Sequence, residues 1–354
     1  MPLGTLLVGW DALLPLLPLP AMVVANLAVM REGGARSASA VVRVCWGVSW
    51  GLLIVIGASA LAYGGLGFTT PRLHAFSAVM CAGAVVSLLT VWRPFRRLVA
   101  RVVPIDPENP VHALAISLTV LLATSQLGNQ LSQDVLQEVA VGARLQPFDL
   151  VVQDIPFVLG AVVGVGLLIR RGGRETLERL GLVRPAVWQV CLGLAAAGLF
   201  YAISAGADAL ATRLTPDLAQ QVGAATKQLF GQLDNPVGIA TIALTAGIAE
   251  EALFRGALQP RLGIPWVAVV FALTHTQYGL SVSVVAVFVL ALGLGVLRRI
   301  ANTTTTMICH TAYNAAVGIS IAGVLLPPAI AVEAALIALT ATTFAWTRRH
   351  HTTA

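Results

Sequence analysis

Long apolar runs separated by short polar segments follow one another along the chain. Runs of about 17 to 25 apolar residues have the length of a membrane-spanning helix, and their number predicts about eleven spans. These are Leu6–Met30, Trp46–Leu66, Phe76–Trp92, Val111–Leu127, Leu150–Ile169, Val187–Ala211, Val237–Leu258, Ile264–Tyr278, Leu280–Leu297, Thr303–Leu326 and Ala329–Trp346. The eighth run is short, which indicates a little-tilted helix, a kinked helix or a re-entrant unit shared with the ninth. The predicted fold is all-α, a polytopic bundle of transmembrane helices.

Two polar stretches interrupt this pattern. Residues 170–184 carry leucines among charges, which is typical of a short interfacial helix on the cytoplasmic face. We expect this stretch to separate an N-terminal bundle of about five spans, residues 1–184, from a C-terminal bundle, residues 185–354. The second stretch, Thr212–Asn235, has leucine and valine at near-helical spacing and predicts an amphipathic helix on the outer surface.

The composition agrees with a protein that lies mostly in lipid. Hydrophobic residues make up 57% of the chain and charged residues only 11%, whereas roughly 25% of the residues of a typical soluble domain are charged. The net charge is +6, but the basic residues form short clusters between apolar runs. Such clusters are a topology signal. We therefore expect a lipid bilayer around the chain and no nucleic-acid partner.

The positions of the basic residues predict the orientation of the bundle. If the N-terminus lies outside, alternation of the spans leaves only four of the 22 basic residues outside, which are Arg72, Arg144, Arg213 and Lys227. Because cytoplasmic loops are enriched in Lys and Arg, the N-terminus is predicted outside and the C-terminus inside. The predicted location is the cell membrane, crossed many times.

Few ionisable residues fall within the predicted spans. Because a titratable side chain in a spanning helix is costly, each is a functional candidate. The candidates are Asp11, Asp154, Asp208, Glu250, Glu251, Arg255, His275, His310 and Glu333. Five of them lie between residues 250 and 310, so this segment is where we expect the chemistry.

The first element of this segment is a pair of neighbouring acids. Glu251 precedes Arg255 by one helical turn, in the order that favours an ion pair, and we expect that pair to be structural. Glu250 is rotated by about 100° on the helix, and the residue one turn after it is the apolar Phe254. An acid without a counter-ion in an apolar helix suits a general base that works near neutral pH.

Two histidines and an asparagine on later spans complete the group. His275 follows Phe271 by one turn, and His310 shares a helix face with Asn314. By helical rise His275 lies roughly 18 Å deep, so a bend near the start of its helix is needed to bring it level with the others. Because histidine suits proton transfer near neutral pH, these residues together with Glu250 point to a hydrolytic site.

The ordered motifs E-E-x-x-x-R, F-x-x-x-H and H-x-x-x-N resemble those of the CPBP intramembrane proteases, also called the Abi family. This group includes the type II CAAX prenyl endopeptidases and bacteriocin-processing proteins. The resemblance covers about residues 185–325, with the catalytic core at about 237–325, and the first 184 residues match no family pattern. It implies an intramembrane endopeptidase that cleaves a membrane-associated peptide or protein.

The resemblance also implies a role for each matched residue. Glu250 and His275 are held to activate a water, and His310 and Asn314 to stabilise the oxyanion. Glu251, Arg255 and Phe271 are supporting residues. The substrate stays open among prenylated C-terminal peptides, leader peptides and membrane-anchored regulators. Because Glu250 lies roughly 8 Å from the inner charged band, we expect the site to open towards the cytoplasm.

A zinc ion is the alternative to a metal-free site. Glu250, His275 and His310 would supply one carboxylate and two imidazoles, which suit a catalytic zinc. Two features favour a reaction without a metal cofactor. Asn314 shares the His310 face, and an amide is a good oxyanion donor but a poor zinc ligand. In addition, no carboxylate is expected beside either histidine, because Glu251 is taken by Arg255. We therefore predict cleavage that survives chelation.

Two other functions could use the same residues. A proton- or cation-coupled transporter could use Glu250, His275 and His310, but the sequence has no inverted repeat and no paired broken helices. The second is a non-proteolytic membrane partner protein that keeps the same residues. The motifs H-E-x-x-H and G-x-S-x-G are absent, which disfavours a zinc-helix metalloprotease and a rhomboid-like serine protease.

Overall fold

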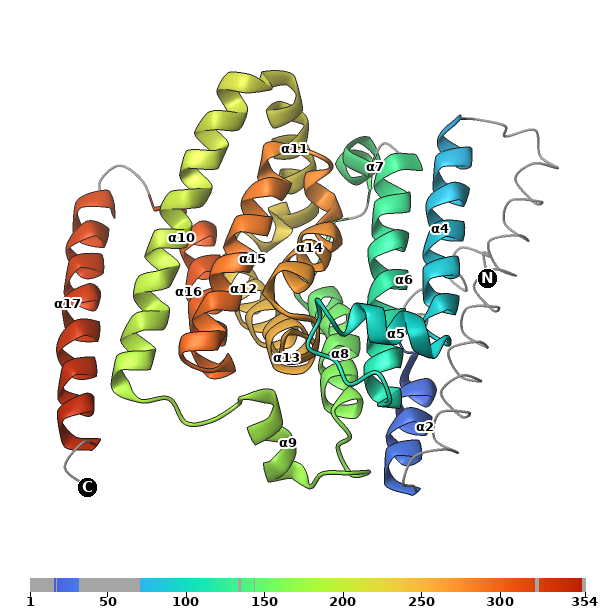
Figure 1. Cartoon of the computed structure of the whole chain (residues 1–354). Coiled ribbons are helices and arrows are strands. Elements are labelled where there is room, and N and C mark those ends of the chain that lie inside the picture. Colours follow the sequence, from blue (N-terminus) through green and yellow to red (C-terminus); the bar gives the residue numbers. More distant parts are fainter. Residues whose placement is uncertain are drawn as a thin grey trace.

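The chain folds into a bundle of helices (Figure 1). The computed structural model describes residues 16, 18–31, 71–132, 135–142, 144–321 and 325–351. Within these ranges it contains helices and no β-strand. The predicted all-α fold is confirmed.

The helices of the first half, as far as they are described, are α2 (Pro18–Arg31), α4 (Pro71–Leu89), α5 (Arg93–Val99), α6 (Pro110–Ser132), α7 (Val135–Val141), α8 (Pro147–Gly164) and α9 (Gly173–Leu180). Those of the second half are α10 (Val187–Leu214), α11 (Pro216–Phe230), η2 (Gly231–Leu233), α12 (Pro236–Glu251), η3 (Ala252–Leu258), α13 (Gln259–Leu262), α14 (Ile264–Thr274), η4 (Thr276–Tyr278), α15 (Val282–Ile300), α16 (Thr303–Ile319) and α17 (Leu326–His351). The predicted interfacial stretches contain the helices α9 and α11.

Six of the described helices are long and apolar enough to cross a membrane. They are Pro110–Leu131, Pro147–Gly164, Val187–Leu214, Pro236–Leu262, Val282–Ile300 and Leu326–Arg349. They correspond to the fourth, fifth, sixth, seventh, ninth and eleventh predicted spans. Together they make the chain a multi-pass membrane protein.

The remaining predicted spans do not form full crossing helices where they are described. The eighth is corrected, because its helix α14 has only 11 residues and ends at Thr274. The tenth contains α16, which has 17 residues. The third is a bent pair, Ser77–Leu89 and Arg93–Val99, at an angle of 102°.

The first two predicted spans lie partly or wholly outside the described residues. The first is described as a continuous helix only from Pro18, as the short α2. The second, Trp46–Leu66, is outside the described ranges. The count of eleven spans and the orientation with the N-terminus outside therefore stay predictions.

Helix α12 lies near the centre of the bundle and packs against both α16 and α8. Helix α10 packs between α16 and α17, and α14 packs against α15 and α6. Figure 1 shows α9 and α13 towards one end of the bundle and α11 at the other. The central position of α12 places its last turn, which carries the two neighbouring acids, among several helices.

Candidate active site

The packing of α12 against α16 brings the first and third motifs together. Helix α16 begins after Asn302, whose side chain accepts a hydrogen bond from Thr305 N at 2.8 Å and so caps the helix. Gly247 on α12 allows a close approach, because a Cβ there would lie 2.9 Å from the backbone nitrogen of Thr311. One turn after Gly247 on α12 comes Glu251, and His310 directly precedes Thr311.

Glu251, Arg255 and His310 form a buried charged cluster. Glu251 Oε1 lies 3.0 Å from Arg255 Nη1 and 3.0 Å from His310 Nδ1. The side chains of Glu251 and Arg255 are 0% and 1% exposed. The predicted ion pair is confirmed. It lies where α12 continues into the π-helical turn η3, a rare conformation that is frequent at functional sites.

The contact between Glu251 and His310 corrects one prediction. No carboxylate was expected beside either histidine, because Arg255 was expected to occupy Glu251. Instead one carboxylate oxygen serves both partners. Because a carboxylate only accepts hydrogen bonds, His310 Nδ1 carries the proton and donates it to Glu251. The carboxylate thereby orients the imidazole, and that argument against a metal no longer holds.

Glu250 has a different environment from its neighbour. Its Oε2 lies 3.9 Å from His310 Nε2, and this buried oxygen has no hydrogen-bond partner among the described residues. The side chain is 15% exposed. The two acids therefore differ in their contacts, since Glu251 Oε1 has two partners at 3.0 Å and Glu250 Oε2 faces His310 Nε2 at 3.9 Å.

Phe271 links the second motif to this cluster. Its ring centroid lies 4.7 Å from that of His275 and 6.1 Å from that of His310. The guanidinium carbon of Arg255 lies 4.3 Å from the same centroid, as in a cation–π contact. Phe271 thus touches the side chains of the other two motifs, and its buried ring sets the spacing between the two histidines.

His275 is the C-terminal cap of α14 and does not lie within the helix. Its Nδ1 is 2.9 Å from the carbonyl oxygen of Phe271. A carbonyl only accepts, so Nδ1 donates, and Nε2 of the neutral ring is left as an acceptor. The ring is stacked on Tyr278 at 6.2 Å, a partner that the sequence did not single out. Gly263 separates α13 from α14, so the helix that leads to His275 begins directly after it.

Asn314 is the least constrained of the predicted residues. It lies one turn after His310 on α16 and is half-buried. Its side-chain amide makes no hydrogen bond to any described residue. Its position on the His310 face agrees with the spacing argument.

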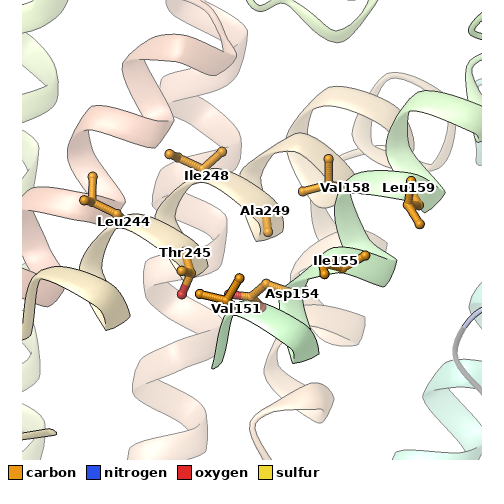
Figure 2. A pocket seen from close by; sticks show the side chains of 9 residues that line it. All are labelled: Val151, Asp154, Ile155, Val158, Leu159, Leu244, Thr245, Ile248 and Ala249. Atoms are coloured by element: carbon orange, nitrogen blue, oxygen red, sulfur yellow. The ribbon is translucent and has the colours of Figure 1, made fainter. Parts of the chain in front are cut away.

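A groove opens between α8 and α12 next to the acids (Figure 2). Its volume is about 320 Å³, and apolar side chains form most of its walls. Ala249, the residue before Glu250, lines it. Figure 2 shows Asp154 and Thr245 side by side in the groove. Asp154 was noted as an acid within a span, but only the tertiary structure places it beside α12.

The donors for a metal ion are only partly brought together. Glu250 and His310 approach within 3.9 Å, but His275 reaches them only across the ring of Phe271. Within the described ranges, no group of three or more His, Cys, Asp or Glu side chains has the geometry of a metal site. Whether the reaction needs a metal therefore stays a prediction.

Comparison with known proteins supports the motif assignment. Residues 232–316 match the family model of the type II CAAX prenyl endopeptidase Rce1-like proteins. This range holds all three motifs, from Glu250 to Asn314. No curated protein and no solved structure matches the chain. The resemblance predicted from the motifs is confirmed over this range.

Proposed function

We propose that the protein is an intramembrane endopeptidase that hydrolyses a peptide bond of a membrane-associated substrate. The observation that carries this proposal is the difference between the two neighbouring acids on α12. Glu251 Oε1 contacts both Arg255 and His310 at 3.0 Å, whereas the nearest charged partner of Glu250 is His310 Nε2, 3.9 Å from Oε2. The family match over the same residues favours a protease over the transporter alternative.

Glu250 and His275 activate the attacking water. Glu250 accepts a proton from the water while the oxygen of that water bonds to the scissile carbonyl carbon. A neutral water thereby becomes the nucleophile. His275 accepts a hydrogen bond from the other O–H of this water at Nε2, because its Nδ1–H is already donated to the Phe271 carbonyl. Its function is therefore to orient the water.

His310 and Asn314 stabilise the oxyanion that forms. In its protonated state His310 donates from Nδ1 to Glu251, and Nε2–H is left to bind the developing charge. The amide of Asn314, one turn away, is the second donor. When the tetrahedral intermediate collapses, the C–N bond breaks, and Glu250 transfers its proton to the leaving nitrogen. The cycle needs no metal step.

The groove between α8 and α12 supplies a route from the bilayer to Glu250. Its walls are apolar, so they suit a hydrophobic segment of the substrate, and it ends one residue from Glu250 on α12. Helix α8 lies outside the segment that matches the family. We further propose that the protein lies in the cell membrane, with the end that carries α9 and α13 in the cytoplasm, because these elements are rich in arginine.

Cleavage by the purified protein tests the proposal. The wild-type chain in lipid nanodiscs is incubated with a library of membrane-anchored peptides, and the products are identified by mass spectrometry. Replacing Glu250 by Gln keeps the shape of the side chain but removes the base. We expect Glu250→Gln to lower the rate by about 10²- to 10⁴-fold, the usual contribution of a positioned general base.

Glu333→Gln is the matched control for this experiment. It makes the same chemical change on α17, a spanning helix that packs against α10 and not against α12. We expect it to leave the rate unchanged. Turnover by Glu250→Gln close to that of the wild type would overturn the assignment of the base, and an equal loss in Glu333→Gln would make the effect structural.

A further inference from the structure

Five arginines gather where several helices end on the same side of the bundle. Arg170 and Arg171 follow α8, and Arg179 lies on α9. Arg261 lies in α13, and Arg298 lies in the last turn of α15. We call these residues the arginine cluster. They lie outside the proposed active site, and the first three also lie outside the segment that matches the family.

No carboxylate neutralises the arginine cluster. In the part of the chain that the structure describes, none of its members forms an ion pair with Asp or Glu. The acids of α9 are used elsewhere, since Glu175 accepts from Gly172 N at 2.9 Å and Glu178 pairs with Arg174 at 2.9 Å. Asp106, beside the neighbouring His112, accepts from Glu108 N at 2.9 Å.

The cluster arginines bond only to neutral groups. Arg170 Nε donates to Asn26 Oδ1 at 2.6 Å, and Arg171 donates to the carbonyl of Val165. Arg179 Nη1 donates to the carbonyl of Gly256 at 3.1 Å. The Nε of Arg298 is buried without a hydrogen-bond partner among the described residues.

The scaffold holds these arginines in place. Leu180 at the end of α9 is fully buried, and Gly181 closes the helix in a left-handed conformation with φ +74°. Its carbonyl accepts from Thr303 N at 3.1 Å, which joins α9 to α16. A Cβ at Gly181 would lie 2.4 Å from Nη2 of Arg298, so the guanidinium packs directly on this turn.

The mutual repulsion within the cluster is visible at Arg179. Burial and the neighbouring charges of Arg261, Arg171, Arg298 and Arg170 lower the pKa of its guanidinium to about 10. Burial lowers the pKa of Arg170 as well, followed by the charges of Arg171 and Arg261. Partly buried charges without counter-charge are unfavourable, and in proteins such charges are normally paired.

We propose that the arginine cluster binds a phosphate group, supplied by the headgroup of an anionic phospholipid. Guanidinium groups match phosphate oxygens in pairs of parallel hydrogen bonds. The cluster lies at the ends of spanning segments, where lipid phosphates lie, and basic pockets between such helices bind anionic headgroups. The lipid would supply the negative charge that the protein does not.

Lipid binding by the detergent-purified full chain tests the proposal. Native mass spectrometry measures the affinity of the wild type for phosphatidylglycerol and for phosphatidylcholine, with inorganic phosphate as a separate arm. We expect a preference for phosphatidylglycerol. Arg179→Gln and Arg298→Gln should each weaken its binding about fivefold, and the double variant about 25-fold, as expected when one guanidinium–phosphate contact is lost each time.

Arg174→Gln is the matched control, because Arg174 lies on the same helix α9 but is 91% exposed and paired with Glu178. It should bind phosphatidylglycerol like the wild type. Equal binding of both lipids by the wild type would overturn the proposal without any variant. Binding of inorganic phosphate without a preference for the anionic lipid would overturn the assignment to a lipid, and equal losses in Arg174→Gln would overturn the assignment to this cluster.

Discussion

Two charged clusters in this bundle differ in the source of their counter-charge. Around Glu251 the protein supplies both signs, since one carboxylate oxygen contacts Arg255 and His310 at 3.0 Å each. Around Arg179 the described chain supplies only one sign, and the arginines bond to carbonyls and an amide. The first cluster has both signs of charge within the protein, whereas the described residues supply no acid to the second. Removing a charge should therefore destabilise the first and relieve the second.

The largest expected effect on stability is that of Glu251→Gln, which tests the cluster around Glu251. Glu251→Gln leaves Arg255 buried without a counter-ion and removes the acceptor of His310 Nδ1. We expect the free energy of unfolding to fall by about 3 to 5 kcal/mol, the usual cost of breaking a buried ion pair. Denaturant titration in detergent micelles measures it. Glu250→Gln is the neighbouring control and should cost far less, because the Glu250 oxygen has no hydrogen-bond partner.

The proposed binding of the oxyanion is tested at Asn314, which lies one turn after His310 of this cluster. If its amide binds the oxyanion, Asn314→Ala should lower kcat by about 10²- to 10³-fold, as the loss of one such donor does in other hydrolases. Because the side chain is half-buried and makes no ion pair, the melting temperature should stay near that of the wild type. A changed KM with an unchanged kcat, measured by initial rates, would place Asn314 in substrate binding instead.

A smaller effect on stability, of opposite sign, is expected for a substitution in the arginine cluster. Arg261→Gln removes one of several like charges, so in neutral detergent we expect the protein to become more stable, by at most about 1 kcal/mol, because solvent partly screens the charges. With anionic lipid present the substitution should become destabilising. Thermal unfolding of both proteins in the two conditions measures this change of sign. If Arg261→Gln loses stability in neutral detergent, the arginine cluster is not destabilised by its own charges, and the two clusters do not differ in this respect.

The smallest expected effect is that of chelation. If the protein's own residues supply the charge at the active site, treatment with a zinc chelator should leave the cleavage rate unchanged within about twofold, well below the loss from removing a base. Metal analysis of the active enzyme accompanies the assay. Stoichiometric zinc, with activity lost on its removal and restored on its return, would contradict this prediction. The active site would then depend on an external ion.

The sequence predicted those features that depend on neighbours one helical turn apart. The Glu251–Arg255 pair was predicted from its spacing, and the structure has it. Six of the predicted spans are helices long enough to cross a membrane, because a long apolar run has few alternatives in lipid. The family resemblance, carried by three ordered motifs, is confirmed by the match over residues 232–316.

The pattern of apolar residues did not predict where α14 ends. The eighth apolar run predicted a span, but the helix stops at Thr274 and the chain forms a short 3₁₀ turn, η4, next to α7 and α11. The residues that follow this end, His275, Thr276 and Gln277, are polar, but the predicted run was carried across them to Tyr278. The position of His275 as a cap, with its ring against Tyr278, followed from that end and was not predicted.

By itself, then, the sequence determined the class of the protein, its apolar helices and the residues that resemble a protease. Only the tertiary structure decided that Glu251 orients His310, that Phe271 separates the two histidines, and that five arginines gather with no ion-pair partner among the described residues. The reason is physical. Contacts within one helix follow from a fixed rise and rotation per residue, whereas contacts between helices depend on how their side chains pack.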